Sequence, residues 1–218
     1  MLNILFDLDG TLIDSEHFYF DCWNEILADV GVELTYEDWL DNYAGTTVFH
    51  NAQKLKDKYD IAIPIDELVE RRRKLTIHRF KNTNVSLMPF VPETLAYFQR
   101  KGLRMVIATS SQREDVDAIF ERNGLGRFFE FMVTRSDVTN GKPDPESYLL
   151  CVKKLGISTE ECIVLEDTHT GVTAAKAAGL TCYAVQSNTS EHPKLTDADR
   201  IFLNLDEARL YVETTYQL

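Results

Sequence analysis

The chain has 218 residues, of which 44% are hydrophobic, and this is enough for one sizeable domain or for a core domain with a smaller insertion. The formal net charge of −12 repels polyphosphate backbones, so the composition excludes nucleic acid and anionic membrane surfaces as expected partners. The four cysteines form no metal-type pair such as C-x-x-C, and no apolar run approaches the roughly 20 residues that cross a bilayer. We therefore expect a soluble cytoplasmic protein.

The first element is an apolar run at residues 2–6, and it is followed by Asp7, Asp9 and Asp14. The run is too short and too uniformly apolar for an amphipathic helix, which predicts a strand covered on both faces. Along an extended chain Asp7 and Asp9 project to the same side, and Gly10 lets the chain turn away directly afterwards. Like charges at ~4 Å repel by about 4 kcal/mol at an effective dielectric near 20, so we expect a divalent cation here, although a solvated acidic turn explains this stretch equally well on its own.

A helical interval follows this strand, because from Ser15 to about Met88 the pattern changes to consecutive helices rich in aromatic residues. The change of periodicity predicts a helical insertion between the first strand and the rest of the sheet. The predicted domains are a catalytic core, residues 1–14 and 85–218, and a helical cap, residues 15–84.

The later part of the chain has four further apolar runs, at residues 103–109, 128–134, 162–167 and 180–185. Helical segments separate these runs; Pro92 and Gly102 bound one of them, and Ser111 with Glu114 predicts a capping box for the next. Strands that alternate with helices of roughly 10–15 residues indicate parallel β-α-β units with right-handed crossovers. We therefore predict an α/β fold with an open parallel sheet between helices, whose ligand binds beyond the carboxyl ends of the strands.

Polar residues end two of these strands, and a lysine lies in a loop between the two segments. In CIVLEDTHTG the strand ends on Glu166 and Asp167, in VIATSS it ends on Thr109, Ser110 and Ser111, and TNGKPDPE places Lys142 in a loop fixed by prolines. Each stretch alone is also explained by an ordinary turn or helix cap. Together they supply acids for a hard cation, a hydroxyl, a fixed ammonium and a helix start, which are the groups needed around a phosphoryl dianion. Oxygen ligands favour Mg²⁺ over Zn²⁺ at such a site.

Four motifs occur in this order along the chain: DLDGTLIDS, ATSS, GKPDPE and VLEDTHTGVTAAKAAG. They resemble the four successive motifs of the haloacid dehalogenase superfamily. The helical insertion directly after the first motif resembles the cap of the branch that contains phosphoglycolate phosphatase, other small-molecule phosphatases and β-phosphoglucomutase. The resemblance implies a Rossmann-like parallel sheet core with a mobile helical cap inserted after the first strand.

The resemblance also implies roles for the residues that match the motifs. Asp7 matches the nucleophile that forms an aspartyl phosphate, and Asp9 matches the general acid that protonates the leaving alcohol and then activates water. Thr109 matches the hydroxyl that binds a phosphoryl oxygen, and Lys142 matches the lysine that offsets charge between nucleophile and phosphate. The implied Mg²⁺ ligands are the Asp7 carboxylate, the Asp9 backbone carbonyl and Asp167, with Glu166 in or next to the coordination sphere; the implied phosphate-binding residues are Gly10, Thr109, Ser110 and Lys142.

Phosphoryl transfer between sugar positions is the main alternative to hydrolysis, because β-phosphoglucomutase shares the cap and most core positions. Two differences favour hydrolysis: Tyr19 falls where the mutases carry a cap-side His, and Val48 falls where they carry the Arg of a G-x-x-R pattern. Without that Arg the cap lacks an evident cationic residue to bind the distal phosphate of a sugar bisphosphate. The basic run ERRRKLTIHRF is expected to form a solvated helix face, so its arginines are not assigned to the site.

Three other classes of protein fit less well. The dehalogenases lack a catalytic Asp two positions after the first and need no Mg²⁺, whereas Asp9 is present here. A phosphoryl-receiver module would keep the phosphoryl group, and a binding-only protein would turn over no ester. The sequence therefore predicts a Mg²⁺-dependent phosphatase for a small phosphorylated metabolite, a sugar phosphate or a related organic phosphate, which acts as a monomer.

Overall fold

The computed structural model describes residues 2–218, and the chain divides into two compact units. The core unit is formed by the chain up to Ile13 together with Leu87–Leu218, and the helical unit is Asp14–Ser86. The domain boundaries expected from the sequence, after residues 14 and 84, lie next to these positions. The chain therefore leaves the core unit once, directly after the first strand and its turn.

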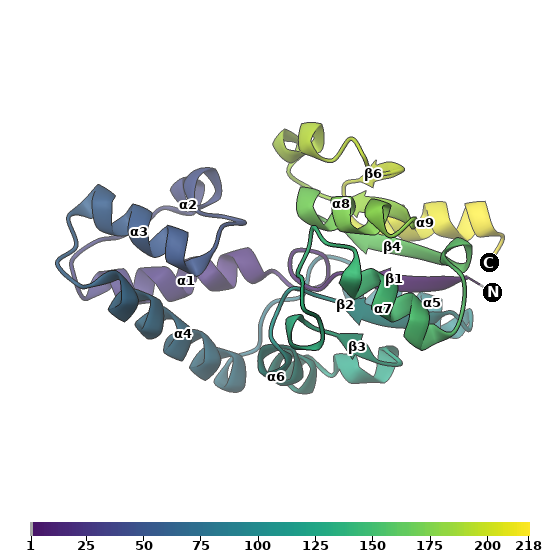
Figure 1. Ribbon diagram of the computed structural model, residues 1–218, viewed down its shortest axis with the longest axis horizontal. Helices are drawn as coiled ribbons and strands as arrows, with labels where there is room; N and C mark the ends of the chain where they lie inside the picture. The colour runs from purple at the N-terminus through teal and green to yellow at the C-terminus, as the bar shows by residue number, and fades with distance from the viewer. Residues whose placement is uncertain (1) are drawn as a thin grey trace. The chain divides into compact units, whose positions relative to one another are not determined.

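The core unit is built on a six-stranded sheet of order β3-β2-β1-β4-β5-β6, in which every neighbouring pair is parallel (Figure 1). Its first strand lies in the middle and its side chains are buried on both faces, as a continuous apolar run requires. This arrangement confirms the predicted α/β class. The strands are β1 (Asn3–Phe6), β2 (Arg104–Ala108), β3 (Met132–Val133), β4 (Cys162–Glu166), β5 (Thr181–Val185) and β6 (Arg200–Phe202).

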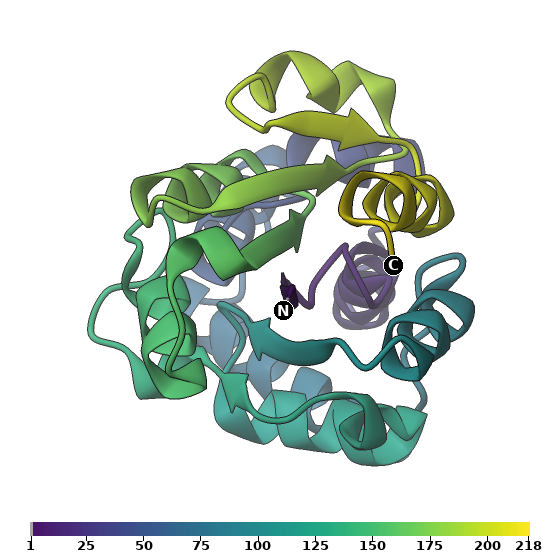
Figure 2. The ribbon, with the colours of Figure 1, turned by 90° about the vertical axis from the view of Figure 1, so that its right-hand side faces the viewer.

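Helices cover both faces of the sheet, with α7 and α8 on one side and α5 and α9 on the other (Figure 2). The face under α7 and α8 holds an apolar cluster that includes Leu5, Val106, Val164 and Val172. Glycine ends several of the helices, as Gly124 does for α6 in the left-handed conformation. The helices of this unit are α5 (Val91–Arg100), α6 (Arg113–Asn123), α7 (Glu146–Leu155), α8 (His169–Ala177) and α9 (Leu205–Tyr216), and the short 3₁₀ turns are η1 (Leu125–Phe128), η2 (Arg135–Asp137), η3 (Thr159–Glu161) and η4 (Thr189–Lys194).

Two local predictions for the core unit were wrong. The capping box of Ser111 and Glu114 does not form, because α6 begins at Arg113 after Gln112 with no side-chain cap, and the Ser111 hydroxyl donates elsewhere. The apolar run at residues 128–134 contributes only the two residues of β3, because its first part closes a 3₁₀ turn. The edge strand β6 has no apolar run long enough to predict it.

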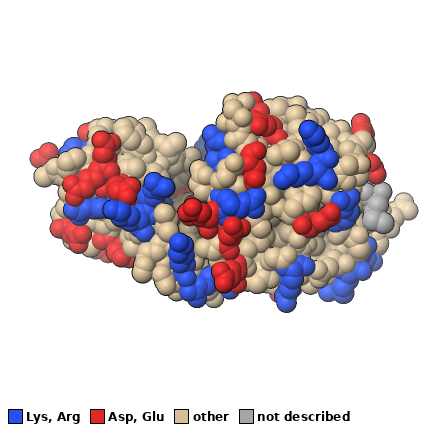
Figure 3. All heavy atoms as spheres, turned by 60° about the horizontal axis from the view of Figure 1, so that its bottom comes forward, with Lys and Arg blue, Asp and Glu red and all other residues tan. Residues whose placement is uncertain are grey.

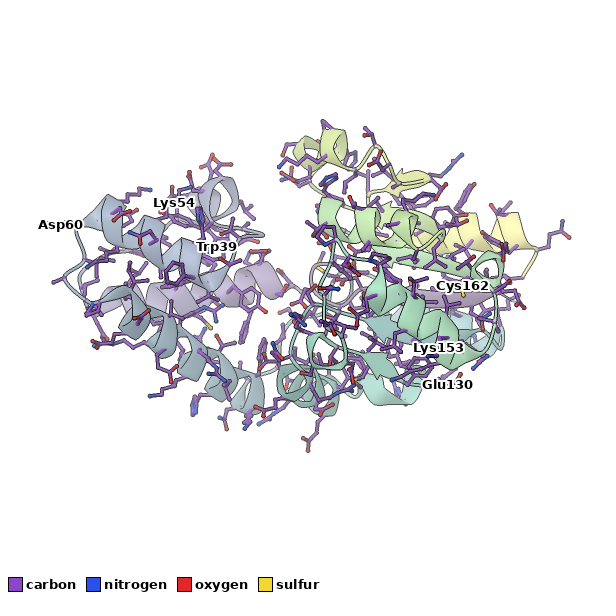
Figure 4. The ribbon with its side chains drawn as sticks, viewed as in Figure 1. Trp39, Lys54, Asp60, Glu130, Lys153 and Cys162 are labelled. Atoms are coloured by element: carbon purple, nitrogen blue, oxygen red, sulfur yellow. The ribbon has the colours of Figure 1, made fainter. Side chains whose placement is uncertain are left out.

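The helical unit contains α1 (Ser15–Ala28), α2 (Tyr36–Asn42), α3 (Val48–Tyr59) and α4 (Ile65–Asn82). Its helices begin at residues whose side chains accept backbone N–H groups: Asp14 caps α1, Thr35 caps α2 and Thr47 caps α3. Their apolar faces enclose a core of their own, in which Trp39, labelled in Figure 4, is only 2% exposed. The insertion therefore has its own apolar core.

The basic run on α4 was predicted to be a solvated face, and for Arg72 this is wrong. Arg73 and Lys74 are exposed, but Arg72 is only 3% exposed and its guanidinium carbon lies 4.6 Å from the centroid of the Tyr19 ring. A guanidinium over an aromatic face is a favourable cation–π contact that partly replaces the water it loses. One of the arginines in the run is therefore part of the interior of the helical unit.

None of the helices in residues 2–218 is long and apolar enough to cross a membrane. On the face of the molecule that Figure 3 shows, Lys and Arg side chains are interspersed with Asp and Glu rather than gathered into one basic patch. The four cysteines are all buried, and they are free thiols.

Close packing of α8 against the end of β4 depends on Gly171. A Cβ built on this glycine would lie 1.7 Å from the Glu166 Oε1 atom and 1.9 Å from its carboxyl carbon. Glu166 is fully buried there, so it cannot turn away into solvent. The first turn of α8 can approach β4 in this way only because residue 171 has no side chain.

We expect Gly171→Ala to lower the free energy of unfolding by at least about 2 kcal/mol, because overpacking outweighs the gain of about 1 kcal/mol that alanine brings to a helix. Urea unfolding of the variant measures this. The matched control is Gly126→Ala, since a Cβ at Gly126 has nothing within 4 Å and the residue is not in the left-handed region. Equal stability of the two variants would contradict the packing described here.

Asp137 ties the loop after β3 to α6. Its Oδ2 atom accepts from the Thr134 N–H, the Thr134 hydroxyl and Arg113 Nη2, each at 2.7 Å. Burial alone would raise the pKa of Asp137, but the hydrogen bonds from Thr134 and the charge of Arg113 hold it below the usual value of 3.8. The ionised form of this carboxyl therefore stabilises the folded state.

We expect Asp137→Asn to lower the free energy of unfolding by about 1–2 kcal/mol at pH 7. The stability that the ionised Asp137 adds to the wild type is fully present above pH 3.8, the pKa of this carboxyl in the unfolded chain. It is lost as the pH falls through the lower pKa of the folded state. Urea unfolding at pH 7 and at pH 3 measures both values, with Asp117→Asn at an exposed position of α6 as the control. A difference that is constant across this pH range would contradict the role of the ionised carboxyl.

Candidate active site

The carboxyl ends of β1, β2 and β4 meet at one edge of the sheet. Phe6 pairs in register with Ile107 on one side and with Leu165 on the other. The residues that follow these positions, among them Asp7 and Thr109, therefore emerge side by side. The Asp7 N–H still donates to the Leu165 carbonyl at 2.9 Å, which fixes the start of this loop to the neighbouring strand.

Three carboxylates gather at this edge. Asp7, Glu166 and Asp167 each offer an oxygen atom, and these atoms lie within 4.8 Å of one another. Burial raises the pKa of Asp7 well above its usual value, against the opposing charge of the nearby lysine. Burial likewise raises the pKa of Asp167, and the negative charge of Glu166 adds to this rise. The cluster thus lacks the positive charge that would let all three carboxylates ionise.

Lys142 supplies one positive charge to this cluster. Its Nζ atom donates to Asp7 Oδ1 at 2.5 Å and to Glu166 Oε1 at 2.6 Å, and its side chain is 5% exposed. Burial alone would lower the pKa of Lys142, but the two carboxylates raise it above its usual value, so the ammonium is charged. One ammonium cannot balance the charge of three ionised carboxylates. This donor set of carboxylate oxygens fits a hard divalent cation.

The loop that carries Lys142 is held by the start of α7. Glu146 accepts from the N–H groups of Thr139 and Asn140 at 2.9 and 2.8 Å, and Asp144 accepts from the Glu146 N–H at 3.0 Å. The Lys142–Pro143 peptide bond in this loop is cis. Acidic side chains thus fix the loop at both ends of the segment that contains the lysine.

Glu166 is fully buried, and both of its oxygen atoms accept hydrogen bonds. Oε2 accepts from the Asp167 N–H at 2.9 Å and from the N–H and hydroxyl of Thr168, both at 3.1 Å. Oε1 accepts from Lys142 and from the Tyr148 hydroxyl, the latter at 3.0 Å. Burial alone would raise the pKa of Glu166, but the charge of Lys142 and these hydrogen bonds lower it. Glu166 is therefore an ionised and fixed partner of Lys142.

Asp9 lies against hydroxyl groups at the end of β2. The Ser111 hydroxyl donates to Asp9 Oδ2 at 2.7 Å, and the Thr109 hydroxyl is 3.3 Å from the same atom. The Ser111 N–H in turn donates to Thr109 Oγ1 at 3.0 Å. Ser110 is exposed at this end of the strand. Two residues of the ATSS motif thus contact the second acid of the first motif.

Gly10 allows Asp167 to approach the first loop. A Cβ on Gly10 would lie 2.0 Å from Asp167 Oδ2, and the residue has a φ of +76° that favours glycine. Thr11 Oγ1 lies 3.5 Å from Asp167 Oδ1, and Gln186 Nε2 donates to the Asp167 carbonyl at 3.3 Å. Asp167 is therefore held from the side of the first motif and from the end of β5.

The residues assigned from the sequence thus fall into two groups, which are joined by the loop after β1. The first group is Asp7, Lys142, Glu166 and Asp167, and the second is Asp9 with Thr109. Sequence reasoning missed Tyr148, which contacts Glu166, and it expected Ser111 to cap a helix, whereas the Ser111 hydroxyl contacts Asp9. Tyr148 lies in the apolar stripe of α7 and is indistinguishable there from a core aromatic residue. The one feature of the sequence that could have indicated its role is a hydroxyl group in the first turn of an otherwise apolar helix face.

Comparison with known proteins shows the family of the chain. Residues 4–185 match the family model of the haloacid dehalogenase-like hydrolases. A phosphorylated carbohydrates phosphatase of Thermotoga maritima is 30% identical over 219 residues, which cover 97% of this chain and 98% of that protein. A fructose-1-phosphate phosphatase of Escherichia coli is 26% identical over 82% of this chain and 93% of that protein.

A solved structure from Thermotoga maritima, described provisionally as a β-phosphoglucomutase, superposes with a TM-score of 0.84 at 28% identity and covers 98% of this chain and 99% of that chain. The region matched by the family model runs from the second residue of β1 to the end of β5 and contains every residue of the two groups described above. The chain is therefore an enzyme that belongs to the haloacid dehalogenase-like hydrolase family.

Proposed function

We propose that the chain is a Mg²⁺-dependent phosphatase that hydrolyses a small phosphorylated metabolite through an aspartyl phosphate on Asp7. The observation that supports this best is the buried contact of Asp7 with Lys142 beside two further carboxylates. Phosphate esters carry nearly two negative charges near neutrality, so a carboxylate can reach the phosphorus only where positive charge offsets the repulsion. Lys142 and a bound cation together provide that charge.

In the first step the Asp7 oxygen that is not held by Lys142 attacks phosphorus, and the bond from phosphorus to the ester oxygen breaks. Asp9 gives its proton to the leaving alcohol, which departs as a neutral molecule. Lys142 keeps the attacking carboxylate in place and offsets the charge between it and the phosphoryl oxygens. The product of this step is an aspartyl phosphate and an ionised Asp9.

In the second step water attacks the phosphorus of the aspartyl phosphate while Asp9 accepts a proton from it. The bond between phosphorus and the Asp7 oxygen breaks, so inorganic phosphate leaves and both acids return to their first state. Thr109, whose hydroxyl lies beside Asp9 in this structure, turns to a phosphoryl oxygen when the substrate is bound. Gly10 and Ser110 complete the phosphate site with backbone and hydroxyl groups.

Magnesium is proposed to bind to the carboxylates of Asp7 and Asp167 and to the backbone carbonyl of Asp9. When bound it neutralises the phosphoryl oxygens and the acids around them. Glu166 lies next to this site, and its two oxygens already accept hydrogen bonds from Lys142, from Tyr148 and from Thr168 at the start of α8. We therefore assign Glu166 to the support of Lys142.

The substrate is proposed to be a sugar phosphate, since relatives of this chain are named as phosphatases of phosphorylated carbohydrates and of fructose 1-phosphate. The net charge of −12 gives no general attraction for anions, so local groups must bind the phosphate. Phosphate-release assays across sugar, polyol, nucleotide and glycolate phosphates identify the ester. The cytoplasmic location and the monomeric state stay predictions.

Transfer between sugar positions is the alternative, because one structural neighbour is described provisionally as a β-phosphoglucomutase. Val48, the first residue of α3, and Tyr19 differ from the residues of the mutases at these positions. The product distinguishes the two reactions, since a phosphatase releases inorganic phosphate in proportion to ester consumed and a mutase yields an isomeric sugar phosphate. An isomer without phosphate release would overturn hydrolysis.

We expect Asp7→Asn to lower the rate of phosphate release by at least about a thousandfold, because the amide is no nucleophile toward phosphorus. Asp9→Asn is expected to lower the rate by about 10²–10⁴-fold, which is the usual contribution of general acid–base catalysis. The assay is steady-state phosphate release from the best ester, with urea unfolding as a check on folding. Asp117→Asn, on the exposed side of α6, is the matched control and keeps the wild-type rate. A near-normal rate in Asp7→Asn would refute the mechanism.

Chelation by EDTA is expected to abolish phosphate release, and added Mg²⁺ is expected to restore it. Mg²⁺ at about 100 times its Kd should stabilise the wild type by about 2.7 kcal/mol, and Asp167→Asn should show none of this stabilisation. Without metal the variant should unfold at an equal or higher temperature than the wild type, because it removes one of three crowded carboxylates.

Asp199→Asn is the matched control for the metal experiment, because Asp199 also lies in the core unit but binds Lys176 and the Cys182 N–H instead. This control should keep the full thermal shift with Mg²⁺. Thermal unfolding with and without Mg²⁺ measures all three proteins. Full activity after exhaustive chelation, or a wild-type Mg²⁺ shift in Asp167→Asn, would refute the metal site.

A further inference from the structure

Tyr148 lies directly behind the pair formed by Lys142 and Glu166. Its side chain is fully buried on α7, and its hydroxyl donates to Glu166 Oε1 at 3.0 Å. The Lys142 Nζ atom lies 4.8 Å from the centroid of its ring. One tyrosine thus contacts the carboxylate through its hydroxyl and the ammonium through its ring.

The ammonium of Lys142 is held between two carboxylates at nearly equal distances, 2.5 Å from Asp7 Oδ1 and 2.6 Å from Glu166 Oε1. This balance depends on where Glu166 Oε1 lies. The other oxygen of Glu166, Oε2, is fixed by three donors from Asp167 and Thr168. The carboxylate can therefore move Oε1 only by turning about the fixed Oε2 atom. The Tyr148 hydroxyl is the second donor on Oε1 and limits this rotation.

We propose that Tyr148 is a positioning residue for the hydrolysis proposed above, acting through Glu166 to hold Lys142 midway between its two carboxylates. Two protons of the ammonium point at Asp7 and Glu166, and its third proton is then directed at the transferring phosphoryl group. Without the hydroxyl, Glu166 Oε1 follows Lys142, and the ammonium is no longer fixed relative to Asp7. A small displacement of such a group lowers the rate of the chemical step more than it weakens substrate binding.

The hydroxyl and the ring of Tyr148 have separable tasks. The ring belongs to the apolar cluster of Val106, Val164 and Val172 beneath α7 and α8, and a phenylalanine would fill the same volume. The hydroxyl is the part that reaches a charged group, and a buried hydroxyl without a partner is costly. Gly171 leaves the room in which Glu166 Oε1 meets this hydroxyl, since any Cβ there would overlap that oxygen atom. Tyr148→Phe therefore tests the hydroxyl alone.

The experiment compares the wild type with Tyr148→Phe and with Tyr183→Phe as the matched control. Tyr183 is also a buried tyrosine of the core unit, and its hydroxyl contacts the hydroxyl of Tyr216 at 3.2 Å. With the best ester from the phosphate-release panel, we expect the kcat of Tyr148→Phe to fall about tenfold, as the loss of a hydrogen bond to a charged group predicts. The KM and the Mg²⁺ concentration for half-maximal activity should each stay within about twofold of the wild type. Tyr183→Phe should match the wild type in all three values.

Beryllofluoride, which forms a phosphoryl-like adduct with aspartate carboxylates, gives a second readout that needs no turnover. Calorimetric titration of each protein with beryllofluoride, in the presence of Mg²⁺, measures this binding. We expect about tenfold weaker binding to Tyr148→Phe than to the wild type, and unchanged binding to Tyr183→Phe. If the wild type hydrolyses no ester but binds beryllofluoride, the proposed function fails and this ratio of affinities alone decides the role of Tyr148.

Three results would overturn the inference. The first is a kcat of Tyr148→Phe equal to that of Tyr183→Phe. The second is a loss of activity that excess Mg²⁺ restores in full, because the hydroxyl would then act through the metal rather than through Lys142. The third is unchanged beryllofluoride affinity in Tyr148→Phe. Urea unfolding of each variant confirms that the folded protein is compared in every case.

Discussion

The contact between the Lys142 ammonium and the buried carboxylates is the interaction on which the rest of the site depends. Asp7 and Glu166 lie 2.5 and 2.6 Å from one Nζ atom, in surroundings almost closed to water. Removing such charges from water costs several kcal/mol for each ion unless a partner and hydrogen bonds replace the lost hydration. The hydrogen bonds and the ammonium that contact Glu166 replace its lost hydration in full. Asp7 and Asp167 have fewer such partners, and a divalent cation beside them would supply the missing positive charge.

The fold makes this concentration of charge possible through register and through two glycines. Parallel pairing aligns the ends of β1 and β4, so that Asp7 and the acids after Leu165 must emerge together. Gly10 and Gly171 then allow the backbone of the first loop and of α8 to lie where any side chain would overlap a carboxylate. Both glycines are needed for the space they leave, and Gly10 is also favoured by its φ of +76°. The dense core behind them, to which Tyr148 belongs, keeps the carboxylates from relaxing apart.

The sequence was sufficient for the parts of the fold that repeat. Buried strands appear as apolar runs and helix ends appear as Pro, Gly and capping residues, so the alternation that predicts a parallel sheet was visible without any contact information. The acids were visible because they follow strands directly, and Lys142 was visible because it lies in a loop fixed by Pro143 and Pro145. Pairings between distant side chains were not, because a hydroxyl such as that of Ser111 can cap a helix or bind Asp9, and only the tertiary structure decides. Arg72 was misread for the same reason, since its cation–π partner Tyr19 lies on another helix.

The two acids of the first motif differ in the groups that contact them, and this difference suits the two tasks proposed for them. Asp7 is bound to an ammonium, which stabilises only the ionised carboxylate and so suits a nucleophile. Asp9 is in contact with the hydroxyls of Ser111 and Thr109, which can donate to a carboxylate and can equally accept from a carboxylic acid. A group that must give up a proton in one step and take one in the next needs partners that serve both states. The first motif thus carries one carboxylate that is paired with an ammonium and one that is in contact with hydroxyl groups.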